Sequence, residues 1–195
     1  MGPSRSSGLA KTLPIFLDKN VKRSKPPDDP YLAAIQRFNQ KGVRYVVVGM
    51  SGINFYARNA RETFGTMDYD FFVEPTLENV AKAMNVLKNL KFNFGTTEGP
   101  FQSNQFKEFV RNRRTLIATT PDGLMIELLL EISGYPFSEL AKDATTFTSE
   151  EGIPVRVGKL NKLLHSKRLA DRPKDRQFLK RYEGLLEQGE SKRLE

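Results

Sequence analysis

The sequence contains no cysteine and only one histidine, His165. Without cysteine there are neither disulfides nor thiolate metal sites, and one histidine alone cannot form a multi-histidine zinc centre. Any metal ion must therefore be held by oxygen ligands. We interpret His165 as a surface or packing residue within a helix.

Long apolar runs are also missing from the chain. No stretch approaches the roughly 20 residues that a membrane-spanning helix requires, and the first residues lack the compact hydrophobic stretch of a signal peptide. We therefore expect a soluble, cytoplasmic protein with no membrane partner. A hydrophobic fraction of 38% over 195 residues is enough to bury one globular core.

Positive charge is concentrated at the two ends of the chain. The net charge is +8: residues 1-30 carry 6 basic and 3 acidic groups, residues 31-155 carry 13 and 14, and residues 156-195 carry 12 and 6. This asymmetry favours a polyanionic partner such as a nucleoside triphosphate, RNA or DNA. The alternative is a charged surface that only maintains solubility. Residues 1-30 are predicted to form a flexible basic arm, followed by a single domain over residues 31-190.

The hydrophobic spacing predicts an α/β chain in which helices and strands are interspersed. Helices are expected at 31-42, close behind Gly49, at 77-90 with Thr76 as the cap, and at about 159-169 and 174-188. Strands are expected at 45-48, 68-73, 113-119, 124-131 and 153-157. The turn residues Pro121-Asp122-Gly123 join two of these strands into a hairpin.

Two aspartates, Asp68 and Asp70, stand two positions apart on one predicted strand. That spacing places both side chains on the same face, with their α-carbons about 7 Å apart. Magnesium prefers hard oxygen ligands and is typically held by a few carboxylates together with substrate phosphates, so the pair suits this ion. The competing interpretation is that both aspartates only solvate the exposed face of an edge strand.

A third carboxylate, Glu127, interrupts the apolar run at 124-131. A charge within a buried strand needs compensation, so Glu127 is expected to have a partner. Glu131 lies on the same face by period-two spacing and is the rival candidate, although it is nearer to the strand end, where solvation is easy. We favour Glu127.

Several motifs occur in an order that is recognisable. They are Val48-Gly49-Met50-Ser51-Gly52, Arg61, Thr66-Met67-Asp68-Tyr69-Asp70, Glu127, Lys167 and Arg172-Pro173-Lys174-Asp175. This order resembles that of minimal nucleotidyltransferases of the DNA polymerase β-like superfamily. The likeness is greatest to bacterial members related to toxin-antitoxin and abortive-infection systems, and it covers about residues 44-186.

The resemblance implies a nucleotidyltransferase fold, with a mixed β-sheet flanked by helices and a helical C-terminal segment. It implies that three carboxylates hold Mg²⁺ or Mn²⁺ and carry catalysis, with Glu127 helping to activate the acceptor hydroxyl. The implied donor is a nucleoside triphosphate such as ATP, and the acceptor is a hydroxyl of RNA, protein or a small molecule. A toxin-antitoxin partner is also implied. The implied catalytic and metal-binding residues are Asp68, Asp70 and Glu127, and the implied nucleotide-binding residues are Gly49, Ser51, Arg61, Thr66, Lys167 and Lys174.

The sequence departs from the usual pattern of these relatives at three points. Met50 follows Gly49 where a second Gly or a Ser is usual, Phe64-Gly65 lengthens the stretch after Arg61, and the third carboxylate is Glu rather than Asp. These departures favour an alternative, a catalytically inactive protein of the same fold that acts as an antitoxin-like partner or a nucleic-acid-binding module. For Lys167 and Lys174 the alternative is a solvated helix face with a salt bridge to Asp175.

A second basic cluster, Arg111, Arg113 and Arg114, lies beside Phe106 and Phe109. Basic residues interleaved with aromatic residues can bind single-stranded nucleic acid through charge and stacking. Helical spacing explains the aromatic residues equally well as part of the core, and this is the more common case.

Overall fold

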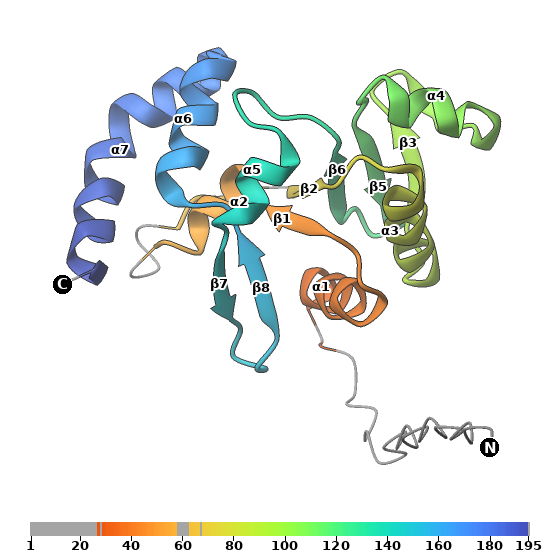
Figure 1. Cartoon of the computed structure of the whole chain (residues 1–195), viewed down its shortest axis with the longest axis horizontal. Coiled ribbons are helices and arrows are strands. Elements are labelled where there is room, and N and C mark those ends of the chain that lie inside the picture. Colours follow the sequence, from red (N-terminus) through yellow and green to blue (C-terminus); the bar gives the residue numbers. More distant parts are fainter. Residues whose placement is uncertain (1–26, 28, 58–62, 67, 195) are drawn as a thin grey trace, which may run out of the picture.

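The computed structural model of the chain describes residues 27, 29–57, 63–66 and 68–194, with side chains described through residue 184 (Figure 1). The predicted arm at 1-30 lies outside the described residues except for its last positions. Of these, Asp29 and Pro30 belong to the start of the first helix, where the Asp29 carboxylate accepts hydrogen bonds from two backbone N–H groups. The first helix thus begins at Pro30, one residue before the predicted start at 31.

A mixed eight-stranded sheet occupies the centre of the described chain. Its order is β4-β3-β5-β6-β2-β1-β8-β7. Strand β2 runs parallel to β6 and β1 runs parallel to β8, whereas the other neighbours are antiparallel. The strands are β1 Tyr45–Val47, β2 Asp68–Val73, β3 Asn93–Thr96, β4 Gly99–Pro100, β5 Leu116–Thr119, β6 Met125–Leu129, β7 Thr145–Thr148 and β8 Pro154–Val157.

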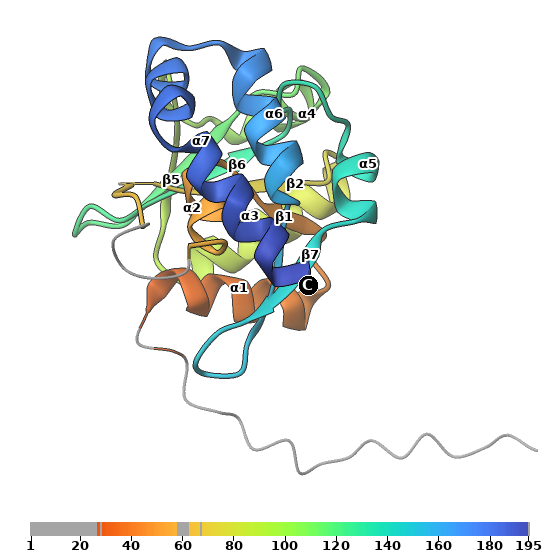
Figure 2. The ribbon, with the colours of Figure 1, turned by 90° about the vertical axis from the view of Figure 1, so that its left-hand side faces the viewer.

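Helices flank this sheet, so the described chain has a mixed α/β architecture, as the sequence predicts. In the view of Figure 2, α1 lies below the central strands and α6 lies above them. No helix of the described residues is both long and apolar enough to cross a membrane. The helices are α1 Pro30–Lys41, α2 Gly49–Asn54, α3 Leu77–Asn89, the short 3₁₀ helix η2 Ser103–Gln105, α4 Phe106–Arg111, α5 Phe137–Lys142, α6 Leu160–Ala170 and α7 Pro173–Leu194.

The alternation of β2 decides what lies on each side of the sheet. Tyr69 stacks on Tyr31 of α1 at 4.9 Å between ring centroids, and Phe71 packs edge-on against Phe38 of the same helix. On the opposite face Phe72 contacts Phe137 of α5. The two aspartates share the second face by period-two spacing, so α1 covers the face away from them.

The carboxamide of Asn79 in α3 ties the helix to the loops at the ends of β1 and β2. Its Oδ1 accepts a hydrogen bond from the N–H of Arg44, and its Nδ2 donates to the carbonyl oxygens of Arg44 and Glu74. The side chain is buried, at 5% exposure, so the carboxamide depends on these backbone groups for its own hydrogen bonds. One polar side chain thus fixes where α3 packs.

Most predicted elements are confirmed, including the β5–β6 hairpin, the Thr76 cap of α3 and the end of α1 at Gly42. The strand predicted at 124-131 was too long, because β6 ends at Leu129 and Glu131 lies beyond it. The strands β3, β4 and β7 and the helix α5 were not predicted from the sequence. These short segments lack a clear apolar period.

Replacing Asn79 by alanine should lower the free energy of unfolding by roughly 2–4 kcal/mol, because three backbone groups lose a buried partner. Urea unfolding followed by circular dichroism measures this change. Asn85→Ala is the matched control, since Asn85 is an exposed residue of the same helix and its loss should change stability by less than about 0.5 kcal/mol. Equal effects of the two variants would contradict the role of Asn79.

Candidate functional site

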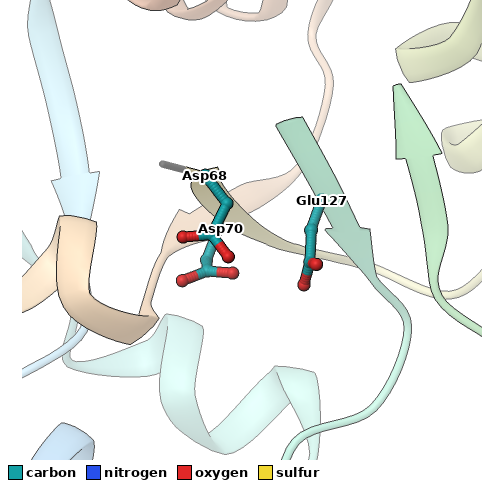
Figure 3. Close-up of side chains that lie close together, drawn as sticks. All are labelled: Asp68, Asp70 and Glu127. Atoms are coloured by element: carbon teal, nitrogen blue, oxygen red, sulfur yellow. The ribbon is translucent and has the colours of Figure 1, made fainter. Parts of the chain in front are cut away.

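Two parallel neighbouring strands bring the three predicted carboxylates together. In the register of β2 and β6, Asp70 is paired directly with Glu127, and Asp68 lies two residues earlier on β2. One carboxylate oxygen from each residue lies within 4.8 Å of the others. Figure 3 shows Asp68 and Asp70 side by side on β2, with Glu127 reaching into the same space from β6. The predicted convergence is confirmed, and the role of these residues as metal ligands stays a prediction.

Hydrogen bonds from polar side chains fix the start of β2. The Ser51 hydroxyl accepts a hydrogen bond from the Asp70 N–H and donates to the carbonyl oxygen of Asp68. The Thr66 hydroxyl bonds the Asp68 carboxylate at 2.5 Å. Because Ser51 is buried in α2, it braces the strand between the two aspartates and holds their backbone in place.

Gly49 begins α2 directly behind the Asp70 carboxylate. Its φ of +61° lies in the left-handed region, which glycine adopts without strain. A Cβ at this position would overlap the Asp70 carboxyl group. Glycine is therefore required at position 49 for two reasons: the backbone conformation with positive φ and the close approach of the Asp70 side chain.

Crowding of negative charge changes how the carboxylates titrate. Burial, with further help from the charges of Asp68 and Glu127, raises the pKa of Asp70 to about 7, although Lys167 and Lys174 oppose this shift. Burial, followed by the charge of Asp68, also raises the pKa of Glu127. A divalent cation would offset this repulsion, and carboxylate oxygens are the ligands that Mg²⁺ prefers, so the residues fit such an ion.

Two of the three carboxylates, Asp70 and Glu127, line a cleft of about 500 Å³, which we call the acidic cleft. Asp70 and Glu127 lie on its sheet side, and Lys167 and Arg172 contribute positive charge from the C-terminal part of the chain. The cleft is lined by Val48, Gly49, Asp70, Arg113, Thr115, Glu127, Leu129, Glu131, Ile132, Ser133, Leu163, Ser166, Lys167, Ala170 and Arg172.

A buried carboxylate, Asp175, holds two of the cations that line the acidic cleft. Lys167 Nζ lies 2.9 Å from Asp175 Oδ1, and Arg172 Nε lies 2.6 Å from Oδ2. Asp175 is 1% exposed. Burial alone would raise its pKa, yet hydrogen bonds from Arg172 and Lys167 outweigh it and hold the pKa below its usual value. This ion cluster joins the end of α6 to the start of α7, which lie side by side (Figure 1).

The remaining predicted nucleotide-binding residues are spread over several places. Ser51 and Thr66 line a separate pocket of about 460 Å³ beside Tyr69 and α1 rather than the acidic cleft. Lys174 is exposed at the start of α7, and its charge reaches Asp70 and Glu127. Arg61 lies outside the described residues. Only Gly49 and Lys167 of this set line the acidic cleft.

Other predicted roles are corrected or narrowed by the structure. Asp171 ends α6 in a left-handed conformation. Phe109 is buried, and Arg114 lies over its ring and pairs with Glu98, so this aromatic residue belongs to the core. The His165 ring lies 2.7 Å from the Tyr135 hydroxyl on the surface of α6.

Sequence reasoning did not assign a site role to Arg172 or Asp175. Both were visible as part of a motif, but a buried pairing of Asp175 with Lys167, eight residues earlier, requires knowing how α6 and α7 pack. Arg113 was considered only as a member of the basic cluster that could bind single-stranded nucleic acid, and its place in the acidic cleft was not predicted. The rival carboxylate Glu131 also lines the acidic cleft, from the loop after β6.

Comparison with known proteins adds no family assignment. No protein-family model matches the sequence, and no curated protein matches it significantly. The functional argument therefore depends on the residues and geometry of the site.

Asp70→Asn should stabilise the protein at pH 8 and leave its stability nearly unchanged at pH 4. The unfolded carboxyl titrates near 4 and the folded one at about 7. Between these values only the folded state keeps the proton, so stability falls as the pH rises through this window. The neutral asparagine escapes this loss, and Tm at pH 8 should increase by on the order of 5 °C. Differential scanning calorimetry over a range of pH measures this change in Tm. Glu78→Gln, at an exposed position of α3, is the control variant, and its Tm should not increase at pH 8.

Gly49→Ala should destabilise the protein more than Gly42→Ala does. Both glycines have positive φ, of +61° and +63°, but an added Cβ meets Asp70 only at position 49 and meets nothing within 4 Å at position 42. Gly42→Ala should cost about 1 kcal/mol for the backbone alone. Combining Gly49→Ala with Asp70→Gly should remove the additional loss in urea unfolding. Additive effects in that double variant would show that the close approach is unimportant.

Proposed function

We propose that the chain is a metal-dependent nucleotidyltransferase of the nucleotidyltransferase fold, which transfers a nucleoside monophosphate from a nucleoside triphosphate to a hydroxyl group. The observation that carries this proposal is the convergence of Asp68, Asp70 and Glu127 beside a cleft with positive charge on its other side. One substrate bound in the cleft could therefore contact both a metal ion held by the carboxylates and the cations that bind its phosphates.

The fold proposal is supported by the placement of the motifs. A glycine starts the helix after β1, the two aspartates lie on the next strand, and the third carboxylate is on the strand parallel to it. Two packed helices, α6 and α7, then return cationic residues to the cleft. This arrangement agrees with the resemblance that the motif order suggests.

Bound to the three carboxylates, Mg²⁺ or Mn²⁺ would bind the triphosphate oxygens and stabilise the charge of the transferred group. The acceptor oxygen forms a bond to the α-phosphorus, and the bond from that phosphorus to pyrophosphate breaks, so pyrophosphate leaves with the electron pair. Glu127 takes the proton of the acceptor hydroxyl.

Positive side chains on the opposite wall orient the donor. Lys167 and Arg172 neutralise part of the triphosphate charge, and Asp175 keeps both of them fixed. Fixed charges do not have to reorganise as the reaction proceeds. Lys174 adds a further positive charge from the surface.

A second function is favoured by the engagement of Ser51. Its hydroxyl is occupied by the β2 backbone, and it lines a pocket other than the acidic cleft. The alternative is therefore an inactive protein that uses the same cleft to bind nucleotide, nucleic acid or a toxin-antitoxin partner. Metal and nucleotide would then bind without turnover.

The two functions are separated by measuring binding and transfer with the same variants. Each nucleoside triphosphate should raise Tm only when Mg²⁺ is present, because a ligand that binds the native state stabilises it. In Asp70→Asn and Glu127→Gln, the transfer of label from α-³²P nucleotides to a component of a cell extract should fall by about 100-fold or more. Glu78→Gln is the control for loss of a carboxylate far from the cleft.

Unchanged label transfer in Asp70→Asn would remove this residue from the mechanism. Nucleotide-dependent stabilisation without any transfer would favour the inactive binding protein. If neither metal nor nucleotide changes Tm, the transferase proposal is wrong, and of the alternative only the binding of nucleic acid or of a protein partner remains.

A further inference from the structure

Arg113 lies where three surface clefts of the described chain meet. It lines the acidic cleft and also two neighbouring clefts of about 580 and 630 Å³. Glu131 and Ile132 line both the acidic cleft and the first of these neighbours, and Pro75 lines both neighbours. We call the two neighbouring clefts the side groove. It continues from the acidic cleft towards α4.

The backbone of Arg113 is held in an unfavourable conformation. Its φ is +54°, in the left-handed region, although it is not glycine. Such a conformation is unfavourable for a residue that has a Cβ, and backbone strain of this kind is often found at functional sites. Arg113 Nη1 makes one long hydrogen bond, 3.4 Å, to the carbonyl oxygen of Pro75, and it forms no ion pair with any described residue. An arginine is thus kept at this junction with most of its donors unused.

Two further cations line the far part of the side groove. Lys107 and Arg111 stand four residues apart on α4, so they share one helix face, and both are exposed. Neither forms an ion pair with a residue of the described chain. The third arginine of the sequence cluster, Arg114, is by contrast occupied by Glu98 and by the Phe109 ring. Charge rather than aromatic stacking therefore distinguishes this surface.

We propose that the side groove binds the phosphates of a single-stranded nucleic acid, and that Arg113 contacts the phosphate nearest to the acidic cleft. The proposal deepens the proposed function, on which it rests, by naming the acceptor class. Arg113 precedes β5, in which Ile117 pairs with Glu127, and Arg113 and Glu127 both line the acidic cleft. A strand whose terminal hydroxyl reaches Glu127 therefore passes Arg113 as it leaves along the groove.

Charge and shape favour a nucleic acid over a small acceptor or an acidic protein. Each of the two clefts of the side groove is larger than the acidic cleft, so together they exceed the space that a small acceptor needs. Three separate cations in a row match a polymer with one negative charge per unit. Ile132 and Tyr135 offer apolar surface to base faces, which a single strand exposes and a duplex does not. Glu108 and Glu131 oppose the anion and limit its affinity.

The test measures RNA binding by the full chain without nucleotide or metal. A fluorescein-labelled RNA of about 12 nucleotides and mixed sequence is titrated with the protein, and binding is followed by fluorescence anisotropy. The titration is repeated at KCl concentrations from about 50 to about 300 mM, because the slope of log K against log salt reports how many phosphates the protein neutralises. Arg113→Asn removes the charge while tolerating the left-handed backbone, and should reduce the slope of log K against log salt by about 0.7. Adding Lys107→Gln and Arg111→Gln should reduce it by about 2 in total. Lys88→Gln on exposed α3 is the control for one lost charge elsewhere.

Glu131→Gln should instead tighten RNA binding, because it removes a repelling charge. The proposal is overturned if the triple variant keeps the wild-type slope, if a duplex binds as tightly as the single strand, or if poly-L-glutamate displaces RNA equally well per charge. RNA binding that depends on Arg113 without any nucleotidyl transfer would leave this inference standing while the proposed function fails. If the protein transfers nucleotides to another acceptor and its RNA binding does not depend on Arg113, the proposed function stands and this inference fails.

Discussion

Three carboxylates placed within a few ångströms of one another cannot all stay charged at one end of a sheet without a positive partner. This constraint explains the neighbourhood of Asp68, Asp70 and Glu127. Burial and mutual repulsion raise the pKa of Asp70 to about 7, and the opposing cations reach it only from a separate pair of helices. The arrangement costs stability in the protein alone, and a divalent ion is the natural means of recovering it.

The cations beside the carboxylates are also compensated by an opposite charge, that of the Asp175 carboxylate. Asp175 is almost fully buried, and it is stable as an anion only because Lys167 and Arg172 both bond to it. Its negative charge in turn holds two positive groups at the cleft. The site therefore consists of two ionic clusters of complementary function, one on the sheet and one at the junction of α6 and α7.

The central part of the fold and of the site could be predicted because it depends on patterns between residues that are close in the sequence. Alternation along β2 put Asp68 and Asp70 on one face, and a single charge inside an apolar strand marked Glu127. What could not be predicted depends on contacts distant in the chain. The closeness of Gly49 to Asp70, the burial of Lys167 with Asp175 and the junction at Arg113 all arise from packing. The short strands β3 and β4 carry Gly, Asn and Pro, which give no periodic signal.

The pairing of β2 with β6 has a consequence for how the molecule reaches its native state. Between these two strands the chain forms α3, β3, β4, α4 and β5, so Asp70 and Glu127 become neighbours only through a contact of long sequence separation. Contacts of that kind form late, because closing a long loop loses entropy before any pairing compensates for it. The hairpin of β5 and β6 can form by local pairing first and then dock onto β2. The mutual repulsion of the carboxylates is therefore postponed to the final assembly of the sheet, when most of the hydrophobic core is already available to outweigh it.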